Sequence, residues 1–233
     1  MSKRQEILRR IRALRKGILF DCDSIISEGL KRWDVAVILC ELKKAGEIKC
    51  LTKGVFYKPK TSLFGLGELP LEKEEIIRYF SERLDAHISG QYGYNLLGLT
   101  EQNAQTVTLA GKHRFKEFCI QNCRFRYMKS YVGYVRDKNT LSDAILLDAL
   151  TNIEKVSGKT GSELFRILKG MIGRMDDSKQ RKLIGMAGNY PTRTRYLLSK
   201  AIGKTSHSVE RDTVLNICNK SKYDIEYKNI VFA

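Results

Sequence analysis

The stretch from Ile18 to Pro59, ILFDCDSIISEGLKRWDVAVILCELKKAGEIKCLTKGVFYKP, decides the fold of the N-terminal part of the chain. Its pattern predicts a short strand, a short helix, a turn, a longer helix and a two-stranded ribbon. The segment just before it, SKRQEILRRIRALRKG, predicts a first helix. This order is typical of a winged helix-turn-helix, a module commonly used to lay one helix in the major groove of DNA.

Apolar spacing and end signals support this order. Gly17 is expected to end the first helix, Asp23 to cap the short helix and Gly29 to end it. Gly46 follows the longer helix, and Gly54 supplies the positive φ that the turn of the ribbon needs. One apolar row of the longer helix is expected to face the interior: Val35, Ile38, Leu39 and Leu42.

The longer helix and the ribbon carry the candidate DNA-binding residues. The first residues of such a helix normally reach base edges, and cations on the ribbon lie beside the phosphate backbone. The candidates are Lys31, Arg32, Trp33, Ala36, Lys43, Lys49, Thr52, Lys53 and Lys58. Winged helices also serve as dimerisation or protein-docking modules, and basic helix faces are often only solvated. Residues 1–60 hold 15 Lys and Arg against 7 Asp and Glu, which favours a nucleic-acid partner.

Beyond the ribbon the sequence predicts a linker over 61–71 and a C-terminal α/β domain over 72–233 for interaction. Helices are expected over 72–84 and 89–98, strands around 106–111 and 124–135, and four further helices. The caps of three of these are expected at Thr140 or Ser142, Thr160 or Ser162, and Asp177 or Ser178. The final segment KYDIEYKNIVF is expected to be a strand. The fold class is therefore α+β (α/β), with a small sheet covered by several helices.

No catalytic or metal site is expected. The three histidines, His87, His113 and His207, occupy no recognisable motif, and the glycines form no phosphate-binding loop. The six cysteines contain no CxxC pair, so reduced thiols are favoured over a zinc site at Cys119 and Cys123. We expect no enzyme activity, no catalytic residues and no cofactor.

The formal net charge of the 233 residues is +16, which predicts an anionic partner. No apolar run approaches the length of about 18–20 residues that a membrane-spanning helix needs, so a cytoplasmic protein without a membrane partner is expected. A second basic surface is expected in the C-terminal domain. Residues 111–136 hold seven Lys and Arg against one Glu, and more cations follow between 166 and 195. Together they predict contact with the DNA backbone or with an acidic protein.

Three segments together resemble the AbiEi-type antitoxin family of bacterial abortive-infection and toxin–antitoxin systems. They are LKKAGEIKCLTKGVFYKP (42–59), GYNLLGLTEQNAQTVTLA (93–110) and RKLIGMAGNYPTRTRYLLSKAIG (181–203). The resemblance implies a winged-helix domain that represses its own operon and a C-terminal domain that counteracts a nucleotidyltransferase toxin. It implies a partner-binding surface at Arg181, Lys182, Arg193 and Arg195. The spacing near Gly90 and the presence of Trp33 depart from the common form of the family.

Three functional classes follow from the sequence. The first is a DNA-binding repressor that doubles as an antitoxin. The second is a stand-alone winged-helix regulator whose C-terminal domain dimerises or senses a signal. The third is an enzyme acting on nucleic acid. Because one recognition helix reads only a few base pairs, a homodimer or paired monomers on double-stranded operator DNA are expected.

Overall fold

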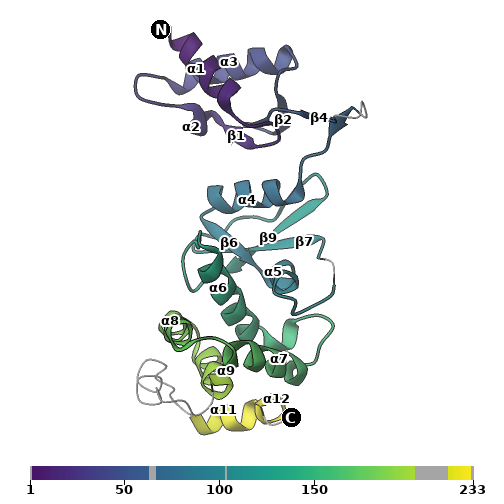
Figure 1. Ribbon diagram of the computed structural model, residues 1–233, viewed down its shortest axis with the longest axis vertical. Coiled ribbons are helices and arrows are strands. Elements are labelled where there is room, and N and C mark those ends of the chain that lie inside the picture. Colours follow the sequence, from purple (N-terminus) through teal and green to yellow (C-terminus); the bar gives the residue numbers. More distant parts are fainter. Residues whose placement is uncertain (1, 63–66, 103, 203–219, 232–233) are drawn as a thin grey trace. The chain divides into compact units, whose positions relative to one another are not determined.

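The computed structural model describes residues 2–62, 67–102, 104–202 and 220–231 of the chain (Figure 1). Its contacts divide the chain into two compact units, Met1–Phe80 and Ser81–Ala233. Both units combine helices with small sheets, so the fold belongs to the mixed α/β class that the sequence predicts. Among the described residues, no helix is both long enough and apolar enough to cross a membrane.

The first unit packs three helices against a three-stranded antiparallel sheet. In chain order the elements are α1 (Lys3–Ala13), β1 (Leu19–Asp21), α2 (Cys22–Ile25), α3 (Arg32–Lys44), β2 (Lys49–Thr52) and β3 (Val55–Tyr57). The strand order is β1-β3-β2, with Phe20 opposite Phe56. Lys53 and Gly54 form the turn between β2 and β3, and Gly54 has φ of 79° as that turn requires.

The interior of the first unit is built from the apolar rows of its helices. The four residues predicted to face inward from α3 are all buried, which confirms that part of the pattern. Full burial of each such side chain contributes about 1.5–3 kcal/mol before other costs. The buried cluster comprises Ile7, Ile11, Phe20, Ile25, Val35, Ile38, Leu39, Leu42, Ile48 and Phe56.

Three predicted helix ends of the first unit are wrong. Helix α2 ends at Ile25 and not at Gly29, because the backbone of Ile26 has already left the helical conformation. Helix α1 ends at Ala13 and not at Gly17, because Leu14 is already extended and Lys58 binds the carbonyl oxygens of Arg12 and Leu14. Asp21, and not Asp23, caps α2: its side chain accepts from the backbone N–H of Ser24, whose hydroxyl accepts in return from the N–H of Asp21. This reciprocal pair satisfies two backbone donors.

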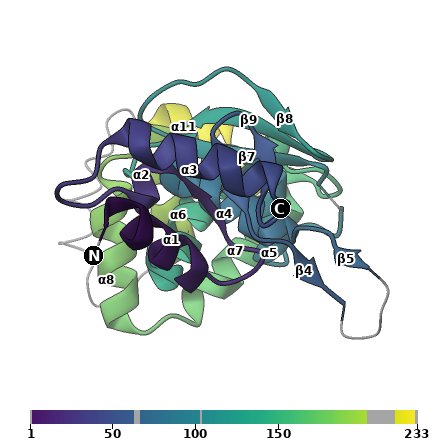
Figure 2. The ribbon, with the colours of Figure 1, turned by 90° about the horizontal axis from the view of Figure 1, so that it is seen from above.

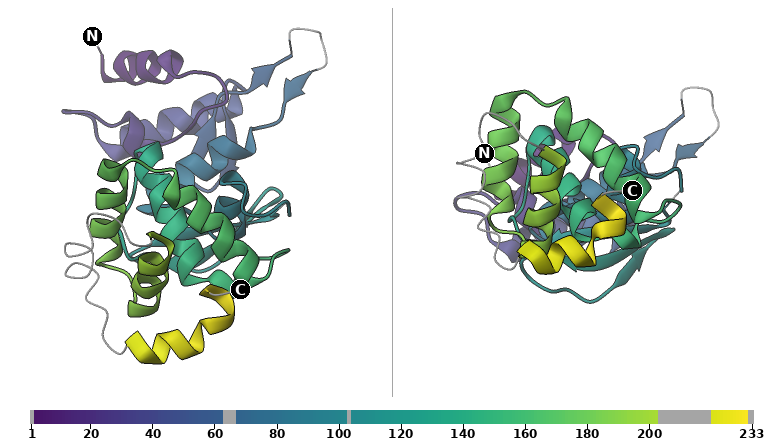
Figure 3. Two further views of the ribbon diagram at one scale, coloured as in Figure 1. Left: turned by 60° about the horizontal axis from the view of Figure 1, so that its bottom comes forward. Right: turned by 90° about the horizontal axis from the view of Figure 1, so that it is seen from below.

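The first unit extends past the ribbon. Within 61–71, where a linker is predicted, β4 (Lys60–Thr61) and β5 (Glu68–Leu69) pair as a second short ribbon, which Figure 3 shows projecting. Most of α4 (Lys73–Arg83) also belongs to this unit. Glu75 accepts a hydrogen bond from the backbone N–H of Leu19 at 2.8 Å, and the hydroxyl of Tyr79 donates to Asp21 at 2.8 Å. These bonds tie α4 to β1.

The second unit contains a four-stranded sheet of order β6-β7-β9-β8. Its strands are β6 (Ala86–Ser89), β7 (Thr106–Gly111), β8 (Phe118–Ile120) and β9 (Cys123–Lys129), and α5 (Gly90–Leu96) follows β6. Strands β7 and β9 are parallel, whereas β6 and β8 run antiparallel to their neighbours. Seen from above, β8 lies beside β9 (Figure 2).

The remaining described helices of the second unit follow the sheet along the chain. They are α6 (Lys138–Thr151), α7 (Gly161–Gly173), α8 (Asp177–Ala187), α9 (Thr192–Ile202), α11 (Lys220–Glu226) and α12 (Lys228–Val231), with a 3-10 turn at Ile153–Lys155. All residues of α6 from Ala144 to Thr151 are buried, so α6 is the central helix of this core. Thr160 caps α7 as predicted, but Asp137 and Asp176 cap α6 and α8, each one turn or less before the predicted residue.

The predicted C-terminal strand is wrong, because its residues form α11 and α12. In KYDIEYKNIVF, Tyr223, Ile225 and Tyr227 alternate with polar residues as in a strand. In the structure Ile225 is 81% exposed, whereas Tyr223 and Tyr227, four residues apart, stack near Tyr196. A helical spacing of four places both tyrosines on one face, and their packing decides the conformation.

Candidate nucleic-acid interface

Helix α3 presents an exposed face opposite its buried row. Trp33, the single tryptophan of the chain, is 76% exposed in the first turn, and Val37, one turn later, is 39% exposed. Cys40 is exposed on the same side, and Ala36 is half-buried. An aromatic side chain this exposed at the start of a helix buries little of its surface, so most of it is available for a partner.

Two cations flank Trp33. Lys31 precedes α3 as its N-cap residue, is exposed, and makes no capping hydrogen bond with its side chain. Arg32 is exposed and forms an ion pair with Asp23, whose carboxylate is also more than half exposed. A surface pair of this kind contributes between 0 and about 1 kcal/mol, so Arg32 can exchange Asp23 for an external anion at little cost.

The ribbon places its predicted residues in two different settings. Lys53 is exposed in the turn, and Thr52 beside it is half-buried. Lys49 is exposed, and its ammonium group donates to Glu68 on β5; this hydrogen bond raises the pKa of Lys49 above its ordinary value. Lys43 is exposed in the last turn of α3. Lys53 therefore has the least engaged ammonium group of the ribbon.

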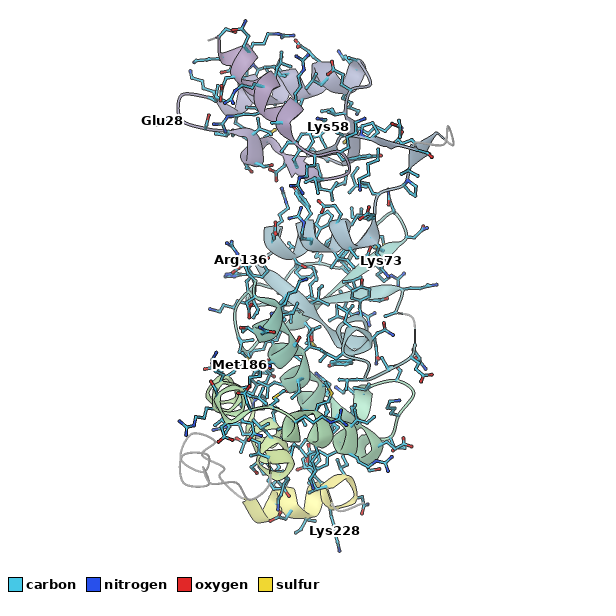
Figure 4. The ribbon with its side chains drawn as sticks, in the orientation of Figure 1. Glu28, Lys58, Lys73, Arg136, Met186 and Lys228 are labelled. Carbon is cyan, nitrogen blue, oxygen red and sulfur yellow. The ribbon has the colours of Figure 1, made fainter. Side chains whose placement is uncertain are left out.

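Lys58 has a different place from the one the sequence predicts. Its ammonium group donates to the carbonyl oxygens of Arg12 at 2.7 Å and Leu14 at 2.9 Å, and the side chain is half-buried (Figure 4). These carbonyls lie at the C-terminal end of α1, where carbonyl groups lack partners within the helix. Lys58 therefore acts as a cap for α1.

Several other cations of the first unit already have carboxylate partners. Glu6 accepts from Arg9 at 3.0 Å and from Arg10 at 2.8 Å, and these hydrogen bonds lower the pKa of Glu6 to about 2. Arg4 pairs with Glu41 at 2.7 Å. Three of the five cations of α1 thus have carboxylate partners, whereas Lys31 and Lys53 form no ion pair within the part of the chain that the structure describes.

The four residues implied as a partner-binding surface lie on α8 and α9, two helices in contact. Arg181, Lys182 and Arg193 are exposed. Arg195 is half-buried, and its guanidinium donates to the hydroxyl of Thr192 at 3.1 Å. Arg193 is therefore better placed than Arg195 to meet a partner.

Sequence reasoning missed a buried polar cluster around Asp148. Its carboxylate accepts from the hydroxyl of Ser89 at 2.5 Å and from that of Tyr190 at 3.1 Å. The ring of His87 lies 3.6 Å from the same carboxylate, and Tyr94 donates to the backbone carbonyl of Asp148 at 3.2 Å. The members come from β6, α5, α6 and the loop before α9, so no local spacing could have indicated them.

The cluster contains serine, histidine and aspartate, but not in the order that nucleophilic catalysis needs. A catalytic histidine lies between the serine and the carboxylate, whereas here Asp148 lies between Ser89 and His87. All three residues are at most 1% exposed. Burial and then the negative charge of Asp148 raise the pKa of the Tyr190 hydroxyl, which stays a neutral donor. The cluster therefore fixes α6 against β6.

No group of three or more His, Cys, Asp or Glu side chains in the described part of the chain could hold a metal ion. Cys123 is buried and Cys119 is exposed. His207 and Cys218 lie outside the described residues.

The chain was compared with protein families, curated proteins and solved structures. No protein-family model and no curated protein matches the chain. Among solved structures, protein RV2827C from Mycobacterium tuberculosis is similar at 10% sequence identity, with a TM-score of 0.46 over 90% of this chain and 79% of that chain. Likeness at this level identifies neither a family nor a function.

Proposed function

We propose that this chain is a DNA-binding transcription regulator whose first unit is a winged helix-turn-helix. The observation that carries the proposal is the exposed row that begins with Lys31, Arg32 and Trp33 at the N-terminal end of α3. Helix order and the β1-β3-β2 sheet support it, because α3 follows α2 through a short connection and β2 and β3 form the ribbon of such a module.

The proposed roles follow from exposure and from existing partners. Lys31, Arg32 and Trp33 reach base edges in the major groove, together with Ala36 one turn later. Lys43, Lys49, Thr52 and Lys53 contact phosphates, which positions the helix. Lys58 is left out of this interface because two carbonyl groups hold its ammonium group.

A useful operator affinity requires two such modules, because one recognition helix reads only a few base pairs. Two copies of the chain therefore bind as a dimer or as paired monomers. Their half-sites have centres separated by whole helical turns of about 10–10.5 base pairs.

A second role, as an antitoxin of the AbiEi type acting in the cytoplasm, is favoured by the exposed cations of α8 and α9. Arg181, Lys182 and Arg193 form a surface suited to an acidic patch on a nucleotidyltransferase. Co-expression with a nucleotidyltransferase encoded beside this chain tests the role. Charge reversal at Arg181 and Arg193 should abolish protection, and reversal at Arg166 and Lys169 on α7 serves as the matched control.

Selection of duplexes from a random pool with the full chain, followed by footprinting, tests the regulator proposal. It should return a repeated short sequence protected at two half-sites. The Arg32→Ala variant should lose about 1–3 kcal/mol of affinity and relax its preference at one base pair. A pool that shows no enrichment at low salt would refute the proposal.

A further inference from the structure

The segment from Lys112 to Lys129, which includes β8 and β9, carries six Lys and Arg side chains against one acidic residue. We call it the basic hairpin. All six of its cations are exposed: Lys112, Arg114, Lys116, Arg124, Arg126 and Lys129. Its single acidic residue, Glu117, pairs with Arg126 at 2.8 Å. The other five have no carboxylate partner within the described part of the chain, in contrast to the paired arginines of α1.

Strand β9 directs two of these cations to the same face of the sheet. Side chains two residues apart on a strand point to the same face, so Arg124 and Arg126 on β9 lie side by side. Phe125 between them is fully buried, which holds the strand in this register. Among the strands that the structure describes, β8 pairs with β9 alone, with Cys119 opposite Arg124, so the hairpin forms the edge of the sheet.

A groove with one cationic residue in its lining adjoins the same face. Thr106 and Thr108 on β7 lie opposite Arg124 and Arg126 in the parallel register. Thr106, Thr108 and Arg126 line an open groove of about 450 Å³. The rest of its lining consists of Gln91, Gln102, Ala104 and Gln105. The face therefore offers cations beside amide and hydroxyl groups, which both donate and accept hydrogen bonds.

We infer that the basic hairpin and this groove form a second nucleic-acid-binding surface, which takes the phosphodiester backbone on its cations and sugar or base groups in the groove. A nucleic acid supplies phosphates together with groups that donate and accept. The carboxylates of an acidic protein only accept, so they could pair with the cations and the amide N–H groups but not with the amide oxygens of the groove. This inference rests on the proposed function and extends it, because the chain then contacts nucleic acid through both units.

Salt-dependent binding of the full chain tests the inference. The hairpin variant carries Lys112→Gln, Arg114→Gln, Lys116→Gln and Arg124→Gln. The control variant removes four exposed cations of the same unit, through Arg166→Gln, Lys169→Gln, Arg174→Gln and Lys179→Gln. Thermal melting of both confirms folding. The probes are a labelled duplex of arbitrary sequence, a single strand of equal length, and poly-glutamate.

The hairpin variant should reduce the slope of log affinity against log salt, because each substituted cation no longer neutralises a phosphate. The expected reduction is about 0.9 per phosphate on duplex, or about 0.7 per phosphate on a single strand. With four phosphates the reduction should total about 3–4, and the control should change the slope by less than about 1. The probe with the larger reduction in slope, duplex or single strand, is the form of nucleic acid that this surface binds. Equal slopes for the two variants on both nucleic acids, or a reduction confined to poly-glutamate, would overturn the inference.

A variant of the first unit separates this inference from the proposed function. Lys31→Gln with Lys53→Gln should reduce operator affinity while leaving the hairpin surface intact. If that variant binds every duplex as the parent chain does while the hairpin variant fails, the role of α3 is refuted and the second surface stands. The opposite pattern refutes the second surface alone.

Discussion

The carboxylate of Glu75 accepts a hydrogen bond from the backbone N–H of Leu19 at 2.8 Å, which joins α4 to the first strand of the sheet. Glu75 is 9% exposed, and Arg78 donates to its carboxylate at 2.7 Å. The folded first unit therefore needs α4, and a fragment that stops after the ribbon at residue 60 leaves the N–H of Leu19 without this partner.

Glu75→Ala should therefore lower the free energy of unfolding by about 1–3 kcal/mol, the cost of leaving a buried donor unpaired. Glu74→Ala, at an exposed neighbouring position of α4, is the matched control and should change it by less than about 0.5 kcal/mol. Urea denaturation of the fragment 1–84 measures both. Equal midpoints for the two variants would show that the bond is unimportant.

Lys53 and Lys58 are five residues apart and should respond in opposite ways to substitution. Lys53→Gln should leave stability unchanged and lower the salt slope of DNA binding by about 0.9. Lys58→Gln should lower the free energy of unfolding by about 1–3 kcal/mol, because two carbonyl groups lose a charged donor. Its salt slope should change little. Thermal melting and binding titrations in parallel check the pair, and a reversed pattern would place Lys58 in the interface.

The pKa of Glu6, lowered to about 2 by hydrogen bonds from Arg9 and Arg10, gives a pH dependence to α1. A carboxyl group with a lowered folded pKa stabilises the fold above its ordinary pKa of 4.5, and this contribution disappears as the pH falls toward 2. Carboxyl carbon shifts in an NMR titration should show a midpoint near 2 for Glu6. In the double variant Arg9→Gln, Arg10→Gln the midpoint should return toward 4.5; an unchanged midpoint would exclude the two arginines as its cause.

The hydroxyl group of Tyr190 should contribute to stability in addition to the packing of its ring. Tyr190→Phe removes a donor to the buried carboxylate of Asp148, which should cost about 1.5–3 kcal/mol. Tyr131→Phe is the control, since its ring packs 4.9 Å from that of Tyr190 and its hydroxyl has no partner among the described residues. Chemical denaturation of the full chain compares them. Equal effects would mean that Asp148 does not depend on this bond.

The sequence predicts the order of helices and strands from α1 to β3 because its signals are local. The buried row of α3 lies within eight residues, and the ribbon turn needs only Gly54. The Asp148 cluster was not predictable, because Ser89, Asp148 and Tyr190 meet only through the tertiary fold. In the sequence, Lys58 looks like one more cation of the ribbon. Its role as a cap becomes visible only where the fold brings the end of α1 next to it. The alternating pattern around Tyr223 and Tyr227 predicted a strand for the same reason. The packing of both rings near Tyr196, which only the tertiary fold brings about, favours a helix.

The central claim is that the start of α3 enters the major groove, and Trp33 reports on it directly. It is the single tryptophan of the chain and is 76% exposed, so its fluorescence comes from this position alone. On titration with the selected operator duplex, its emission should change in step with binding, and acrylamide quenching should fall severalfold as the ring becomes covered. An operator complex in which Trp33 remains as accessible to acrylamide as in the free protein would contradict the claim.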